Sequence, residues 1–109
     1  MSLDFYLEEI PTEPQTIFET NITHNLVPMA KAFGLYEPLW HPELIRAVLA
    51  EDIIEPLSEG LDALLADPEV AQKLNPSNGW GDSKGFARVV GFILETCKAN
   101  PKATLRTCT

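Results

Sequence analysis

The stretch TNITHNLVPMAKAFG, residues 20–34, decides the fold that we expect for this 109-residue chain. Its apolar side chains recur at the spacing of one helix face; they are Ile22, Leu26, Met29, Ala30 and Phe33. Thr20 or Asn21 can cap the first turn, and Gly34 suits the left-handed residue that ends a helix. The pattern predicts a core helix over residues 20–34.

Polar side chains crowd the start of this predicted helix, where free N–H groups and the helix dipole favour anions; they are Asn21, Thr23, His24 and Asn25. Pro28 lacks an N–H donor, so we expect a kink there or an irregular first turn over residues 21–25. An irregular turn leaves backbone N–H groups available to a ligand. These four residues are therefore candidate ligand-binding residues.

Three segments have strand character. Residues 2–8 alternate apolar and polar side chains, residues 16–19 are short and rich in β-forming types, and residues 104–108 resemble a final strand. Residues 11–14 predict the turn of a hairpin. The sequence therefore predicts an α+β fold, in which a small antiparallel sheet of about three strands, an N-terminal hairpin plus a C-terminal strand, packs against four to five helices.

The rest of the chain predicts a connector and four further helical segments. Residues 35–41 are expected to form a connector between two helices. Helix-start prolines or helical apolar spacing predict helices over residues 42–50, 51–66 and 68–74. Asp82 or Ser83 can cap a last helix that ends before Asn100-Pro101. The apolar faces predict the core residues Leu44, Ile45, Val48, Leu49, Ile53, Ile54, Leu57, Leu61, Leu64, Leu65, Phe86, Val89, Val90, Ile93, Leu94 and Cys97.

Composition favours one globular domain over residues 1–109, with 45% hydrophobic and 22% charged residues. No apolar run approaches the ~20 residues of a membrane span, and no secretory signal is expected. The two cysteines, Cys97 and Cys108, have no close-spaced partner, which argues against a metal site and predicts a reducing cytoplasm. We expect no cofactor and no metal.

The net charge of −8 is unevenly distributed. Residues 1–69 hold 14 acidic and 2 basic residues, whereas residues 70–109 hold 2 acidic and 6 basic ones. Such an acidic chain is not expected to bind nucleic acid directly. The main acidic surface is predicted on the helix over residues 51–66; its residues are Glu51, Asp52, Glu55, Glu59 and Asp62. This surface either keeps the protein in solution or mimics nucleic acid toward a basic host protein.

Residues 75–82, NPSNGWGD, form the clearest loop signal in the chain. Trp80 stands between two glycines, so its ring either stacks on a ligand or pins the loop onto the core. Asn78 in the loop, with Lys84 and Arg88 after it, could contact an anionic group. The spacing matches no phosphate-binding loop or dinucleotide motif.

His24 is the candidate for acid–base chemistry because a histidine titrates near neutrality. Three roles remain open for it: a helix-capping or core-polar residue, a ligand contact, or a catalytic group working with a carboxylate. No Gly-x-Ser-x-Gly nucleophile motif is present. His41, beside a helix start, is expected at the surface.

Several motifs in order resemble a family of small uncharacterised proteins that occur in bacteriophages and in bacterial, notably actinobacterial, genomes. The motifs are Asn-Ile-Thr-His-Asn-Leu at 21–26, Met29-Ala30, Gly34-Leu35-Tyr36, Leu39-Trp40, Pro56-Leu57, Gly60-Leu61, Asn-Pro-Ser-Asn-Gly-Trp-Gly at 75–81, Cys97 and Asn100-Pro101. This chain has His41 and a Thr107-Cys108-Thr109 ending where the family commonly has arginine and Ser-Arg. The resemblance implies a small phage or prophage accessory protein, without an activity to transfer.

The leading hypothesis is a non-enzymatic protein that binds a small anionic or nucleotide-like molecule in the bacterial cytoplasm. Its predicted pocket joins the polar stretch of residues 21–25 to the loop with Asn78 and Trp80, and to Lys84 or Arg88. A phage version would sequester a host signalling nucleotide as a counter-defence, and a homo-oligomer would deepen the pocket. The alternatives are an acidic inhibitor of a basic host protein, acting through residues 51–69, and a small enzyme that uses His24.

Overall fold

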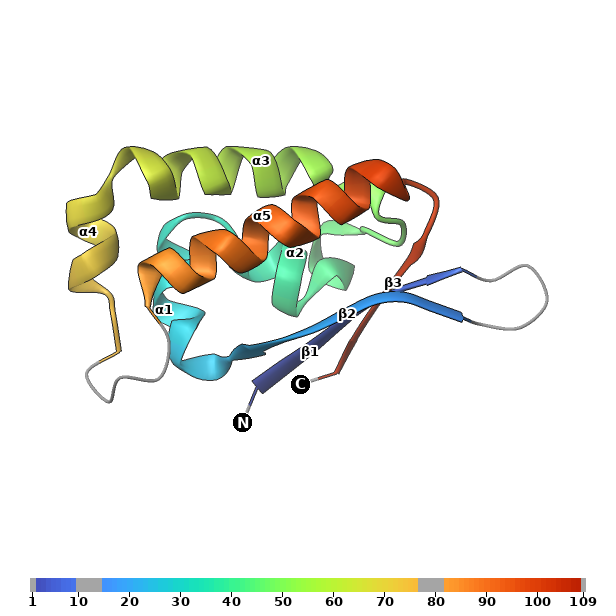
Figure 1. Ribbon diagram of the computed structural model, residues 1–109, viewed down its shortest axis with the longest axis horizontal. Helices are drawn as coiled ribbons and strands as arrows, with labels where there is room; N and C mark the ends of the chain where they lie inside the picture. The colour runs from blue at the N-terminus through green and yellow to red at the C-terminus, as the bar shows by residue number, and fades with distance from the viewer. Residues whose placement is uncertain (1, 10–14, 77–81, 109) are drawn as a thin grey trace.

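The protein is a two-layer structure with a sheet on one side and helices on the other (Figure 1). This computed structural model describes residues 2–9, 15–76 and 82–108. The helices cover one face of the sheet and leave the other face open (Figure 1). The core lies between the layers and contains apolar side chains from both. The predicted α+β class is confirmed.

The sheet contains β1 (Ser2–Glu9), β2 (Gln15–Thr23) and β3 (Thr104–Cys108) in the order β2-β1-β3. Both pairings with the central strand β1 are antiparallel, so the predicted pairing of the two N-terminal strands and the predicted C-terminal strand are confirmed. The predicted turn over residues 11–14 lies outside the described residues. Leu3, Phe5 and Leu7 are fully buried. Their alternation with polar residues explains the orientation of the strand, because successive side chains point to opposite faces.

The predicted helix over residues 20–34 is wrong in its first half. Thr20 to Thr23 belong to β2, where Ile22 pairs with Leu3. A short 3₁₀ turn, η1 (His24–Leu26), follows, and the helix α1 covers only Val27–Ala32. Pro28 lies in the first turn of α1, where its missing N–H costs nothing. Gly34 has a φ of 73°, as expected of the left-handed stop.

The segment after Gly34 also differs from the prediction. The expected connector contains a helix, α2 (Tyr36–Trp40), and the expected helix over residues 42–50 is only the 3₁₀ turn η2 (Pro42–Ile45). Arg46 ends η2 with a φ of 59°. Three residues that were predicted to be core residues of the 42–50 helix are exposed: Leu44 at 66%, Ile45 at 42% and Val48 at 61%. The early end of η2 explains why these side chains do not form one buried face.

The last three helices follow the predicted boundaries closely. They are α3 (Glu51–Ala66), α4 (Pro68–Lys73) and α5 (Ser83–Ala99). Helices α3 and α5 pack against each other, and their buried residues include Ile53, Leu57, Val90, Ile93 and Cys97. Most of the predicted core of these helices is confirmed; Leu65 is an exception, with 63% of its surface exposed. None of the described helices is long and apolar enough to cross a membrane.

Candidate functional site

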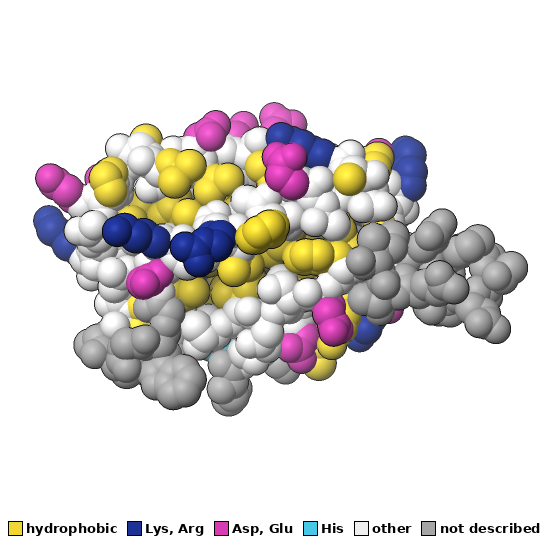
Figure 2. Space-filling model, viewed as in Figure 1, with side chains coloured by type: hydrophobic (Ala, Val, Ile, Leu, Met, Phe, Trp, Pro, Cys, Tyr) yellow, Lys and Arg dark blue, Asp and Glu magenta, His cyan; other side chains and the backbone are white. Residues whose placement is uncertain are grey.

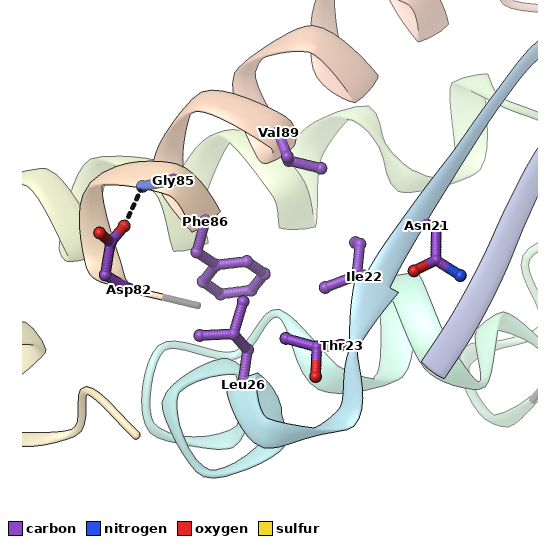
Figure 3. Close-up of a pocket in the computed structure, with 8 residues that line it drawn as sticks. All are labelled: Asn21, Ile22, Thr23, Leu26, Asp82, Gly85, Phe86 and Val89. Atoms are coloured by element: carbon purple, nitrogen blue, oxygen red, sulfur yellow. Dashed lines mark hydrogen bonds between the residues drawn. The ribbon is translucent and has the colours of Figure 1, made fainter. Parts of the chain in front are cut away.

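A cavity of about 260 Å³ lies where the end of β2 faces the first turns of α5 (Figure 3). The described residues that line it are Asn21, Ile22, Thr23, Leu26, Asp82, Gly85, Phe86 and Val89. Four of them come from the 21–26 stretch, three come from the first turns of α5, and the eighth is Asp82, the residue that caps α5. The fold thus brings together two segments that are about 60 positions apart in the sequence.

Local structure explains why these side chains meet. Gly85, Phe86 and Val89 lie on one side of α5, because residues three and four apart are neighbours on a helix surface, and Asp82 is the N-cap just before them. On the other side, strand alternation turns Ile22 toward the helices, and η1 turns Leu26 in the same direction. Figure 3 shows the Phe86 ring pointing from α5 toward Ile22 and Leu26. These three residues are at most 5% exposed, so the cavity has a rigid apolar floor.

Asp82 supplies the charged group of the cavity and also caps α5. Its Oδ1 atom accepts a hydrogen bond of 2.6 Å from the Gly85 N–H (Figure 3). A Cβ atom at Gly85 would approach this oxygen to 3.0 Å, so the glycine permits the close contact. The carboxylate occupies part of the positive helix end and disfavours a second anion inside the cavity.

Two of the predicted polar residues line the cavity with their hydrogen-bonding groups already engaged. The Asn21 Nδ2 atom donates to Ser2 Oγ and to Asp4 Oδ1, both at 2.7 Å, on the outer side of the sheet. Thr23 Oγ1 accepts a hydrogen bond of 3.3 Å from the Asn25 N–H and caps η1. The Asn21 amide therefore points away from the cavity, and these hydrogen bonds fix the segment that forms its wall.

His24 and Asn25 do not belong to the described lining of the cavity. Asn25 is exposed. His24 points elsewhere: its ring centre lies 6.3 Å from that of Trp40, the last residue of α2. Trp40 is 2% exposed, although it falls in the stretch 35–41 that the sequence predicts to be a connector. The sequence around it, Leu39-Trp40-His41-Pro42, does not by itself show whether a tryptophan belongs to the core or to a binding site.

The predicted basic residues lie outside the cavity. Lys84 and Arg88 are exposed on α5, and Figure 2 shows basic side chains on the first half of this helix, above a band of hydrophobic side chains. Lys84 lines a separate hollow with Gln72, Asn75, Asp82 and Ser83, so Asp82 borders both spaces. Asn78 and Trp80 lie outside the described residues. Their predicted roles, and any contact between Trp80 and His24, stay predictions.

The predicted acidic surface is only partly available for a partner. A Glu51 carboxylate oxygen lies 3.0 Å from Lys102 Nζ. Asp52 accepts hydrogen bonds from the N–H groups of Val48 and Leu49, at 3.0 and 2.9 Å, which hold the pKa of its carboxyl below the ordinary value. Glu55, Glu59 and Asp62 are exposed along α3. These three form the remaining acidic stripe.

Within the described ranges, no three histidine, cysteine, aspartate or glutamate side chains stand close enough together to hold a metal ion. Cys97 is fully buried in the core. Comparisons of the chain with protein-family models, with curated proteins and with solved structures found no match in any of the three. The resemblance to a phage and actinobacterial family therefore stays a prediction.

Proposed function

We propose that the protein is a non-enzymatic binder of a small nucleotide-like molecule, which occupies the cavity between β2 and α5. The observation that carries the proposal is the convergence of the polar 21–26 stretch and the α5 start on one partly apolar cavity. Ligand sites are usually apolar concavities with a few polar groups that fix orientation. The Asp82 carboxylate and the Thr23 hydroxyl are such groups here.

The size and charge of the cavity indicate which part of such a ligand lies inside the cavity and which part lies outside. A volume of about 260 Å³ suits one heterocyclic ring system rather than a whole nucleotide. The Phe86 ring offers an aromatic contact, and the Asp82 carboxylate can accept hydrogen bonds from ring N–H groups. Because that carboxylate repels a phosphate, the anionic part would lie outside, toward Arg88 and Lys84 on the same helix.

The test is a binding titration with adenosine and adenosine 5′-monophosphate, followed by the corresponding guanine compounds. Val89→Phe places a larger side chain in the cavity and should abolish binding of nucleoside and nucleotide alike. Arg88→Ala should leave nucleoside binding intact and weaken nucleotide binding about fivefold, the effect of losing one exposed charged contact of about 1 kcal/mol.

Lys98→Ala is the matched control, because Lys98 is an exposed cation in the last turn of the same helix. It should change neither affinity. The proposal fails if none of the four compounds binds at millimolar concentration, or if a folded Val89→Phe protein binds them as tightly as the wild type. Native mass spectrometry of protein purified from bacterial cells would then show whether another small molecule copurifies. In a phage, the proposed binding would serve to sequester a host signalling nucleotide.

A second candidate function is inhibition of a basic host protein through α3. The observation in its favour is that Glu55, Glu59 and Asp62 are exposed along one helix. Such an association should weaken steeply with salt and disappear in a Glu55→Gln, Glu59→Gln, Asp62→Asn triple variant. A partner that binds this variant unchanged would eliminate electrostatic mimicry.

A further inference from the structure

Two buried ring nitrogens lie on neighbouring side chains without a hydrogen-bond partner among the described residues. They are His24 Nε2 and Trp40 Nε1. The ring centres are 6.3 Å apart, and the ring planes are inclined by 50°. Roughly 90% or more of buried polar groups in proteins have a partner, so an unpartnered one calls for an explanation. Two such nitrogens on adjacent rings point to one missing partner shared by both.

Both rings are held in place by their surroundings. Trp40 is 98% buried, and the Tyr36 ring stacks on it with a centre-to-centre distance of 5.8 Å and an angle of 17°. Lys31 Nζ lies 4.8 Å from the centre of the Tyr36 ring, which adds a cation–π contact to the stack. His24 follows the Thr23 cap directly. Burial and stacking therefore hold the Trp40 indole N–H away from solvent.

A single oxygen atom within reach of both nitrogens would satisfy both. Two hydrogen bonds of about 2.9 Å to a shared oxygen can join nitrogens up to about 5.8 Å apart, and the two rings are neighbours, with centres 6.3 Å apart. The indole N–H can only donate, so the oxygen must accept. His24 Nε2 either donates or accepts, depending on the tautomer. A hydroxyl-type oxygen suits both tautomers, whereas a carbonyl or carboxylate oxygen suits only one.

We propose that His24 Nε2 and Trp40 Nε1 together bind a single hydroxyl-type oxygen, either of a water molecule or of a ligand hydroxyl group. The site is separate from the proposed nucleotide cavity, since neither ring is part of that cavity's described lining. It gives His24 a binding role that requires no catalysis. It also explains how an indole can be buried at the end of α2 without losing a hydrogen bond.

The test uses the full chain labelled with ¹⁵N. The protein has two tryptophans, so a Trp80→Phe variant assigns the indole N–H signal of Trp40. We expect a cross-peak between this N–H and a long-lived water, together with slow hydrogen exchange. A high-resolution crystal structure should show an oxygen within hydrogen-bond distance of both nitrogens. Addition of ethanol distinguishes the two sources: a saturable shift of the Trp40 signal means that an outside hydroxyl enters, and no shift means a held water.

His24→Phe should remove the water cross-peak and shift the Trp40 indole signal. His41→Gln is the control, because His41 Nδ1 is already engaged with Glu43 Oε1 at 2.8 Å, and it should leave the water cross-peak in place. The inference is overturned if the crystal structure shows no oxygen between the rings, or shows a protein atom bonded to either nitrogen. That structure decides the matter even where His24→Phe does not fold. A null result in the nucleotide titration leaves the inference untouched.

Discussion

Gly60 and Leu35 are so close that a Cβ atom on Gly60 would lie 2.6 Å from Leu35 Cγ. The same atom would also lie 2.9 Å from the Phe33 carbonyl oxygen, which belongs to the backbone and cannot move aside cheaply. Helix α3 therefore crosses the turn after α1 at a distance that only glycine permits. This contact connects α3 to the segment that leads from the candidate site into α2.

Gly60→Ala is expected to destabilise the protein. Overpacking costs about 1–3 kcal/mol, more than the roughly 0.5–1 kcal/mol that alanine gains over glycine inside a helix. Gly91→Ala is the matched control, since its Cβ would meet nothing within 4 Å, and it should be neutral or stabilising. Urea unfolding followed by circular dichroism measures both. Equal effects at the two sites would refute the close contact.

Asp82→Ala should lower the free energy of unfolding by about 0.5–2 kcal/mol, because α5 loses its N-cap. Asp82→Asn keeps an acceptor oxygen and should lose much less. Asp67→Ala provides a comparison, because Asp67 caps the short helix α4 through a longer hydrogen bond of 3.4 Å. Thermal unfolding should rank the three variants with Asp82→Ala lowest. A wild-type melting temperature for Asp82→Ala would show that this cap does not stabilise α5.

The hydrogen-bonded Asp52 carboxylate should make the free energy of unfolding fall in acid. Its pKa is lower in the folded protein than its ordinary value of 3.8, because the carboxylate accepts two backbone hydrogen bonds. The folded state therefore binds this proton less readily than the unfolded state, and the stabilisation is complete above the ordinary value. This stabilisation should disappear as the pH falls through the lowered pKa of Asp52 in the folded protein.

The measurement for Asp52 is the difference in unfolding free energy between wild type and Asp52→Asn from pH 7 down to pH 2.5. That difference should shrink below about pH 4, since protonation of Asp52 leaves the wild type with an uncharged side chain too. Glu55→Gln, on the same helix and exposed, is the control. A difference that stays constant over the whole range would contradict a role for the charged carboxylate.

The two cysteines should differ in reactivity. Burial raises the pKa of the Cys97 thiol to about 12, whereas Cys108 is exposed on β3. Since the thiolate is the reactive form, iodoacetamide at pH 8 should modify Cys108 and spare Cys97 until the protein is denatured. Intact mass spectrometry reads the number of adducts, and a Cys108→Ser variant should gain none while folded. Rapid labelling of Cys97 in that variant would mean that α5 opens readily.

Local patterns determined much of the architecture. The alternation of Leu3, Phe5 and Leu7 predicted β1. Helical apolar spacing, the helix-start proline at position 68 and a cap at Asp82 or Ser83 predicted α3, α4 and α5 close to their observed limits. Each of these signals is carried by neighbouring residues, so no knowledge of the rest of the fold is needed. The sequence also identified Asp82 as a candidate helix cap, but it did not show that Asp82 lines a cavity.

Only the tertiary structure decided the middle of the chain. Ile22, Leu26 and Met29 fit a helix face equally well, but pairing with β1 draws residues 20–23 into β2, because an available strand edge outweighs weak helix propensity. Contacts distant in sequence also made the cavity between β2 and α5 and brought His24 beside Trp40. The sequence alone determined which residues were unusual. Long-range packing determined which of them meet, because periodicity describes the faces of each element and not the partners of those faces.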